Sequence, residues 1–363
     1  MKTVCIYHSI DLDGWMSAAI VKYWHFTKPD EKIKSGYQGT TIPIDDIDFI
    51  GYNYGQPIPD LSEYDKVIMC DISFPTNIMI DLGKRLGMNF IWIDHHVSAI
   101  IPIEGYIRDN NNFAISGIRN TKFAACELTW KCFFFNDPMP EIVRLLGRYD
   151  CFGHKFTKED ESRRLTLLEY TKSTTRIMSQ EEQDELANLN IKLLEEQKVL
   201  EFQYGARQII ANYEEAYTWL THSLHLTNWN YDLDSPEDVI WEKGIHIYQY
   251  LCTEAKQTYR NGFEVILSEY RDETCSEERL HKFICINKER FNPINFGIDY
   301  HKEGYDGAAC FHRTKDGKWA FSLYNDNGLV DCSQIAKQFG GGGHKGAAGF
   351  VLNNKDFNIL IND

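Results

Sequence analysis

Short apolar runs alternate with amphipathic stretches along the first part of the chain, up to about residue 155. Three runs, at residues 3–7, 66–70 and 90–93, are continuous enough to predict strands that are buried on both faces. The alternation with helical segments predicts an α/β fold with a mostly parallel sheet. Helices are expected after Asp13-Gly14 and over about residues 77–86, 123–135 and 141–147.

The remaining pattern predicts a helical middle and a second, smaller mixed α/β domain. Residues 156–180 are charged and predict a loop and a helix, and apolar spacing predicts one long connecting helix over about 180–219. A turn-rich segment at 228–236 marks the expected boundary. Further elements are expected at 244–260 (helix), 264–267, 282–286, 307–312 and 319–324 (strands) and 333–339 (helix). We therefore expect a catalytic domain over 1–155, a helical linker over 156–235 and a C-terminal domain over 236–363.

Composition and charge narrow the possible functions. The 363 residues include no apolar stretch suited to spanning a bilayer, and the N-terminus enters a strand without room for a signal peptide. We expect a cytoplasmic protein whose ten scattered cysteines are reduced and mostly buried. The net charge of −15 disfavours binding of long nucleic acid, which is normally driven by a basic face. Any anionic substrate is expected to be short and held locally.

Each of the three predicted strands ends at a side chain that can bind a metal ion. Because the carboxyl ends of parallel strands meet at one edge of a sheet, these side chains are expected to lie together. The whole set is His8, Asp11, Asp13, Asp71, His95 and Asp150. Two divalent cations would balance its four carboxylates. The nitrogen and oxygen donors suit manganese, iron or cobalt better than calcium, with zinc as an alternative, and manganese is the ion we expect.

A glycine-rich loop at residues 340–346 is the second candidate site. Backbone N–H groups at Gly341, Gly342 and Gly343 can approach an anion closely, and His344 and Lys345 add positive charge. We interpret this loop as a phosphate-binding site, the alternative being a flexible turn between a helix and a strand. Further phosphate partners among the arginines are Arg119, Arg148 and Arg313, for which a structural or solvated role is the alternative.

Together these motifs resemble the DHH phosphoesterase superfamily. The matching features are His-x-x-Asp-x-Asp-Gly at residues 8–14, an aspartate after the second predicted strand, Asp-His-His at 94–96, a later aspartate and Gly-Gly-Gly-His at 341–344. The resemblance implies a DHH domain joined by a helical linker to a DHH-associated C-terminal domain, with the active site in the cleft between them. The opening turn resembles oligoribonucleases of the NrnB type, also described as phosphodiesterases of cyclic AMP and cyclic GMP.

The resemblance also implies roles for individual residues. One metal ion would be held by His8, Asp11 and Asp71, and the other by Asp13, Asp71, His95 and Asp150. Asp71 would then bridge the two ions. Asp94 would orient a ligand histidine, and His96 would contact the substrate phosphate and could donate a proton to the leaving oxygen.

We therefore expect a metal-dependent phosphohydrolase that converts short oligoribonucleotides or cyclic nucleotides to mononucleotides. One alternative is a phosphoanhydride hydrolase similar to pyrophosphatases and exopolyphosphatases; the glycine loop disfavours the pyrophosphatase branch, which has a different C-terminal domain. The other alternative is a catalytically silent nucleotide sensor, which the presence of all six metal-binding residues disfavours. Neither a membrane nor long nucleic acid is an expected partner.

Overall fold

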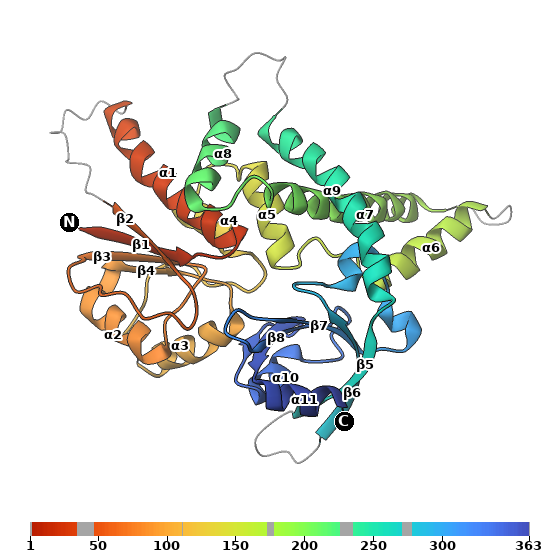
Figure 1. Cartoon of the computed structure of the whole chain (residues 1–363). Helices are drawn as coiled ribbons and strands as arrows, with labels where there is room; N and C mark the ends of the chain where they lie inside the picture. Colours follow the sequence, from red (N-terminus) through yellow and green to blue (C-terminus); the bar gives the residue numbers. More distant parts are fainter. Residues whose placement is uncertain are drawn as a thin grey trace. The chain divides into compact units, whose positions relative to one another are not determined.

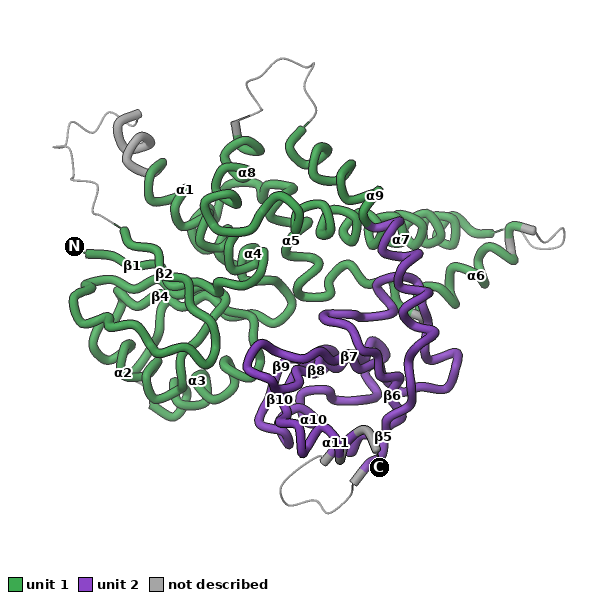
Figure 2. Tube along the Cα trace, viewed as in Figure 1, with its two compact units in different colours: residues 1–247 green, residues 248–363 purple. Residues whose placement is uncertain are grey.

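The structure is a computed structural model that describes residues 2–34, 47–110, 112–172, 178–225, 235–270 and 278–362. The chain divides into two compact units, residues 1–247 and 248–363 (Figure 2). The division into three domains that the sequence suggests stays a prediction. Among the described residues, no helix combines the length and the apolar character needed to cross a bilayer.

The first unit contains a four-stranded parallel sheet with the strand order β2-β1-β3-β4 (Figure 1). The strands are β1 (Thr3–His8), β2 (Ile47–Tyr52), β3 (Lys66–Cys70) and β4 (Phe90–Ile93). Strands β1, β3 and β4 lie where the apolar runs predict them. Strand β2 is absent from the sequence prediction because it is an edge strand with mostly half-buried or exposed side chains, so it lacks a continuous apolar run.

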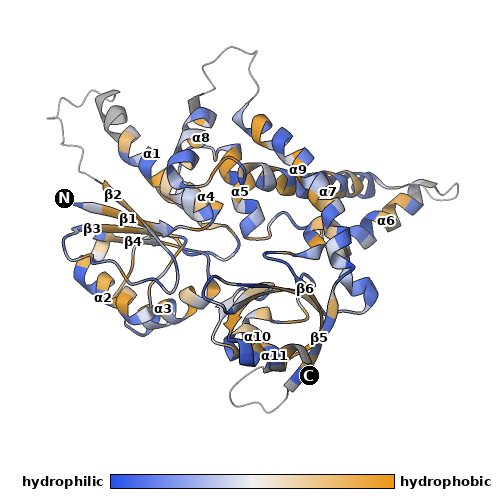
Figure 3. Cartoon of the chain, viewed as in Figure 1, coloured by the Kyte–Doolittle hydropathy of each residue, from blue (hydrophilic) through white to orange (hydrophobic). Residues whose placement is uncertain are grey.

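Side chains of the sheet alternate between two apolar clusters. On β1, Cys5 and Tyr7 pack into one cluster while Val4 and Ile6 pack into the other. Helices α1 (Leu12–Lys34) and α4 (Ala125–Phe133) cover the first face, and α2 (Thr76–Leu86) and α3 (Val97–Asp109) cover the second (Figure 1). Helix α3 is a further element that the sequence reading missed; its sequence contains Pro102. Figure 3 shows the hydrophobic character of these strands.

The helical middle of the chain differs from the prediction of one long helix over 180–219. Its helices are α5 (Glu141–Asp150), α6 (Lys158–Lys172), α7 (Gln180–Ala206), α8 (Tyr213–His225) and α9 (Pro236–Tyr259). The expected helix is broken at 207–212 because Asn212 begins a new one: its side chain accepts a hydrogen bond from the Glu215 N–H at 3.0 Å. The Glu215 carboxylate in turn accepts the Ala211 N–H at 2.6 Å. Most of the turn-rich segment at 228–236 lies outside the described residues.

Helices α7 and α9 contact each other backbone to backbone. A Cβ atom at Gly244 would lie 1.8 Å from the carbonyl oxygen of Glu201, and one at Gly205 would lie 2.0 Å from that of Ile240. Only glycine permits this approach. The contact holds the N-terminal half of α9 against α7.

The second unit is the mixed α/β domain that the sequence predicts. Its six-stranded sheet has the order β5-β6-β7-β8-β10-β9, in which only β6 and β7 are parallel neighbours. The elements are β5 (Phe263–Tyr270), β6 (Glu278–Asn287), β7 (Gly307–Arg313), β8 (Trp319–Tyr324), α10 (Cys332–Gln338), β9 (Gly342–Gly343), β10 (Ala347–Leu352) and α11 (Asn354–Asn362). The predicted loop at 340–346 thus contains a short strand.

Replacing Gly244 with alanine tests the contact between α7 and α9. The added methyl group collides with a backbone carbonyl, so we expect the free energy of unfolding to fall by about 1–3 kcal/mol. The matched control is Gly105→Ala in α3, where a Cβ atom meets only Arg108 Nη2 at 3.8 Å, and where alanine should be neutral or stabilising. Thermal unfolding of both variants measures the difference, and equal midpoints would contradict the close contact.

Candidate metal centre

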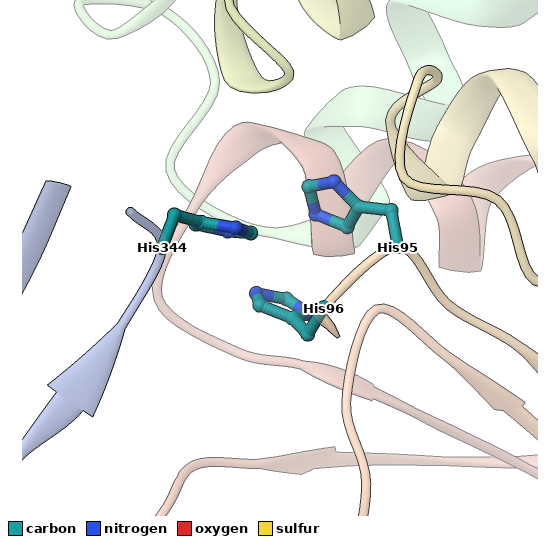
Figure 4. Close-up of side chains that lie close together, drawn as sticks. All are labelled: His95, His96 and His344. Carbon is teal, nitrogen blue, oxygen red and sulfur yellow. The ribbon is translucent and has the colours of Figure 1, made fainter. Parts of the chain in front are cut away.

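The ends of three strands place the predicted metal-binding residues at one edge of the parallel sheet. Strand β1 ends at His8, Asp71 follows β3, and Asp94, His95 and His96 follow β4. Figure 4 shows the imidazoles of His95 and His96 next to each other, with ring centroids 4.5 Å apart. Local sequence and parallel pairing together therefore bring these side chains to one place.

The first group of donor atoms comes from His8, Asp11 and Asp71. His8 Nδ1 lies 2.6 Å from Asp11 Oδ2 and 3.4 Å from Asp71 Oδ2. The other Asp11 oxygen accepts the Gly14 N–H at 2.9 Å, so this carboxylate also caps the first turn of α1. A Cβ atom at Gly14 would lie 2.1 Å from the His8 carbonyl oxygen, and glycine is therefore needed for α1 to begin so close to β1.

The second group comes from Asp13, His95 and Asp150. His95 Nε2 lies 3.6 Å from Asp13 Oδ2 and 3.2 Å from Asp150 Oδ2. Asp150 is the last residue of α5, which extends beyond the end predicted at 147. The Asp13 carboxylate also accepts the backbone N–H groups of Ala125 and Cys126, at 2.8 and 2.7 Å, where α4 begins.

Asp71 lies between the two groups. Its Oδ2 atom is the one near His8, and its Oδ1 atom lies 3.2 Å from His95 Nε2. The side chain is almost completely buried, and the backbone adopts a left-handed conformation with φ of 62°. The structure thus brings all six predicted metal-binding residues together, with one oxygen of Asp71 directed to each group.

The spacing of these atoms fits the coordination of metal ions. With metal–ligand bonds of about 2.0–2.2 Å, neighbouring donors around one ion lie about 3–3.5 Å apart. The separations between histidine nitrogens and aspartate oxygens run from 2.6 to 3.6 Å, and all donor atoms of each group lie within 4.8 Å of one another. Within the described part of the chain, His8 Nδ1 and Asp71 Oδ1 are buried and form no hydrogen bond with regular geometry, as expected for atoms that face an ion. These buried histidine and aspartate clusters can therefore hold metal ions.

The electrostatics of the metal-free centre favour bound protons. Burial raises the pKa of Asp13 well above its usual range, and the charges of Asp71 and Asp150 raise it further. Burial lowers the pKa of His8, but its hydrogen bonds and charge interactions with Asp11 and Asp71 raise that pKa to about 11. Because metal ligands must be deprotonated, cation binding at this centre displaces protons.

Asp94 holds the imidazole of His96. The Asp94 Oδ1 atom accepts the backbone N–H groups of His95 and His96, at 2.7 and 3.0 Å, and lies 2.7 Å from His96 Nδ1. The resemblance assigns Asp94 to the orientation of a ligand histidine; in the structure its side-chain partner is the neighbouring histidine that is expected to contact phosphate. This contact fixes the direction of the His96 ring.

Sequence reasoning missed Asn53, in the turn after β2. His8 Nε2 lies 3.3 Å from Asn53 Oδ1, an oxygen that also accepts the Tyr54 N–H at 2.8 Å. An acceptor at Nε2 keeps one imidazole proton there, so that a cation which displaces the proton on Nδ1 would find the Nδ1 lone pair directed to it. The sequence carries no signal for this role, because β2 was not predicted and an asparagine in a turn has an ordinary structural explanation.

The three candidate arginines have structural partners. Arg119 Nε donates to Glu104 Oε1 at 2.9 Å, and Arg148 forms an ion pair with buried Glu127. The Arg313 guanidinium lies 6.0 Å from the ring centroid of Trp319. These contacts are those of arginines with a structural role, the alternative to phosphate binding.

The three glycines at 341–343 in the second unit differ in how much space surrounds them. A Cβ atom at Gly341 would lie 2.0 Å from the Gly349 carbonyl oxygen, and one at Gly343 would lie 2.6 Å from Ala348 Cα. At Gly342, by contrast, a Cβ atom would meet no atom within 4 Å, so packing within the described structure does not require glycine there. The structure also places His344, half-buried, and Lys345, exposed, in the turn between β9 and β10.

Comparison with known proteins shows distant similarity over most of the chain. No protein-family model matches it. The uncharacterized protein R106 of Acanthamoeba polyphaga mimivirus is 23% identical over 96% of this chain and 67% of its own length. Among solved structures, the pGpG-specific phosphodiesterase PggH of Vibrio cholerae aligns with a TM-score of 0.41 at 12% identity, over 99% of this chain and 96% of PggH. An exopolyphosphatase-related protein of Bacteroides fragilis aligns with a TM-score of 0.38 at 13% identity, over 96% and 86% of the two chains.

Replacing Asn53 with alanine tests its influence on His8. Loss of the acceptor frees the imidazole to change tautomer or to rotate, so we expect Mn²⁺ affinity to fall about 10- to 100-fold. The control is Asn110→Ala, which removes an exposed hydrogen bond to the Tyr106 carbonyl at the end of α3 and should bind Mn²⁺ as the wild type does. Isothermal titration calorimetry measures both affinities. Wild-type affinity in the Asn53 variant would show that the contact does not orient His8.

Proposed function

We propose that this chain is a dinuclear metal-dependent phosphodiesterase that hydrolyses short oligoribonucleotides or cyclic nucleotides to mononucleotides. The observation that carries the proposal is the placement of the two Asp71 oxygens, 3.4 Å from His8 Nδ1 and 3.2 Å from His95 Nε2. A carboxylate with one oxygen in each donor group can bridge two cations, as in two-metal sites that hydrolyse phosphoesters. The mixed nitrogen and oxygen donors support manganese as the ion.

The proposed ligands divide into two sets that share Asp71. One ion would be held by His8, Asp11 and Asp71, and the other by Asp13, Asp71, His95 and Asp150. When bound, the two ions would lower the pKa of a water molecule and stabilise charge on the phosphoryl oxygens. Asn53 would keep His8 in the ligand tautomer, and the N–H groups at the start of α4 would hold Asp13 in place.

His96 is the proposed acid and phosphate contact. Burial lowers the pKa of its imidazole, but the adjacent Asp94 carboxylate raises that pKa above the ordinary value. A histidine that is kept protonated can donate a hydrogen bond to a phosphate oxygen and a proton to the leaving oxygen. Asp94, which lies 2.7 Å from Nδ1, would orient the ring so that Nε2 can face the substrate. No nucleophilic side chain is needed in this scheme.

The substrate class follows from charge and from the loop of the second unit. A net charge of −15 opposes binding of a long polyanion, so the substrate is proposed to be a few nucleotides long. The N–H groups of Gly341 and His344 already bond the carbonyl oxygens of Ala336 and Ala347, at 2.9 and 2.7 Å. The loop from Gly341 to Lys345 would therefore bind a phosphate of that substrate through its other N–H groups and the two basic side chains.

The activity can be tested with Mn²⁺ and a panel of di- to pentaribonucleotides, pGpG, cyclic AMP, pyrophosphate and long single-stranded DNA. We expect mononucleotide release from the short RNAs and a loss of at least about 100-fold in Asp71→Asn, because the bridging charge is gone. Asparagine tolerates the left-handed backbone of this position, so the variant should fold. Asp81→Asn, on the exposed face of α2, is the control.

Three outcomes of this panel would count against the proposal. Hydrolysis of pyrophosphate alone would move the chain to the phosphoanhydride hydrolases. Retained activity in Asp71→Asn would remove the bridging role. No hydrolysis by the wild type across the panel would favour a nucleotide sensor.

The loop is tested by the pair Gly342→Ala and Gly341→Ala. A methyl group at position 342 meets open space, so we expect an unchanged melting temperature together with a raised KM for the short RNAs, because the methyl group obstructs the approach of phosphate. A methyl group at position 341 collides with the Gly349 carbonyl oxygen and should lower the melting temperature by several degrees. An unchanged KM in Gly342→Ala would argue against phosphate binding at this loop.

A further inference from the structure

The metal centre is not equally buried on all sides. The side chains of Asp11 and Asp150 are 37% and 34% exposed, whereas those of Asp71 and His95 are each only 2% exposed. Within the first unit, solvent therefore reaches the centre beside Asp11 and Asp150. A substrate that enters from solvent meets these two residues before the buried ones.

Arg207 lies on the Asp150 side. It is the exposed residue that directly follows α7. Its guanidinium carbon lies 5.2 Å from the ring centroid of Tyr149, the neighbour of Asp150, and 5.4 Å from that of Tyr204. Contact with two aromatic faces restricts the position of the guanidinium, and a hydrogen bond to the Tyr149 side chain holds it further.

Among the described residues, no carboxylate forms an ion pair with Arg207. Arg119 and Arg148, by contrast, pair with Glu104 and Glu127. Burial lowers the pKa of Arg207, but interactions with Tyr149, Tyr204 and the Asp150 charge raise it above the usual value. The guanidinium is charged, and its five N–H groups offer more donors than the bond to Tyr149 uses.

The charge balance of the centre calls for such a group. Its carboxylates are Asp11, Asp13, Asp71, Asp94 and Asp150. Two divalent ions and the protonated imidazole of His96 would balance these five charges, so the negative charge that a phosphate substrate adds would be stabilised by a further cation at the open side. A guanidinium fork matches the spacing of phosphate oxygens and forms charge-assisted hydrogen bonds with them.

Resting on the proposed function, we propose that Arg207 is a substrate-binding residue that contacts a phosphate oxygen beside Asp150. The sequence reading passed over it because it lies in the helical middle of the chain, far from every motif. Its proximity to the centre depends on the packing of α5 against α7 and on the break that ends α7 at residue 206.

The test compares Arg207→Gln and Arg207→Lys with Arg163→Gln as the control. Arg163 is an exposed arginine of α6 that pairs with Glu185. We expect Arg207→Gln to raise the KM for pGpG about 10- to 100-fold, with unchanged Mn²⁺ affinity and melting temperature. Arg207→Lys should retain part of the binding, and Arg163→Gln should match the wild type.

Comparison of pGpG with GpG, which lacks the terminal phosphate, identifies the contact. If the increase in KM caused by Arg207→Gln disappears with GpG, Arg207 contacts the terminal phosphate. If the increase persists, Arg207 contacts the phosphate between the nucleosides. An unchanged KM in Arg207→Gln would overturn the inference. So would a matching loss of Mn²⁺ affinity, because Arg207 would then act by supporting Asp150.

Binding of pGpG, measured by calorimetry, separates this inference from the proposed function. A wild type that binds pGpG without hydrolysing it contradicts the phosphodiesterase proposal, whereas weaker binding by Arg207→Gln would still support the contact. Hydrolysis by the wild type together with unaltered binding in the variant contradicts the inference alone. A wild type that neither binds nor hydrolyses pGpG and GpG overturns both.

Discussion

Mutual repulsion among buried carboxylates is the constraint on which the first unit depends. Asp13, Asp71 and Asp94 are all at most 2% exposed and lie at one edge of a single sheet. Such a cluster cannot remain fully ionised unless positive charge is close by. Histidines His8 and His95 between the carboxylates supply part of it in the metal-free protein, and divalent cations can supply the rest.

The backbone also contributes to this balance. Helix α1 begins at the site, where the Gly14 N–H bonds Asp11. Helix α4 begins against Asp13, and the His96 N–H, just before α3, bonds Asp94. Helix N-termini carry unsatisfied N–H groups and a positive partial charge, so three helix starts at one place stabilise anions there. The same hydrogen bonds cap the helices, and capping and metal binding are therefore compatible uses of one carboxylate.

Close packing requires glycine at some positions of this chain and does not require it at others. Gly14 permits α1 to start against β1, and Gly205 and Gly244 permit α7 and α9 to touch. In the C-terminal loop, packing requires glycine at 341 and 343 but not at 342. At Gly340, packing does not require glycine either, but its φ of +74° does. Most glycines of this motif thus serve a tight hairpin, whereas neither packing nor a positive φ explains Gly342.

The sequence alone determined the three apolar strands β1, β3 and β4, the residues at their ends and the α/β class of both units. These features are local: an apolar run predicts a buried strand, and parallel pairing then collects whatever follows each run at one edge. Tertiary structure decided the break between α7 and α8, the choice of His96 as partner of Asp94, and the neighbourhoods of Asn53 and Arg207. Asn53 lies 45 positions from His8 along the chain, and its role arises only when an edge strand with a weak apolar pattern pairs with β1. Contacts of this kind depend on how packed elements meet, which no periodicity within one segment encodes.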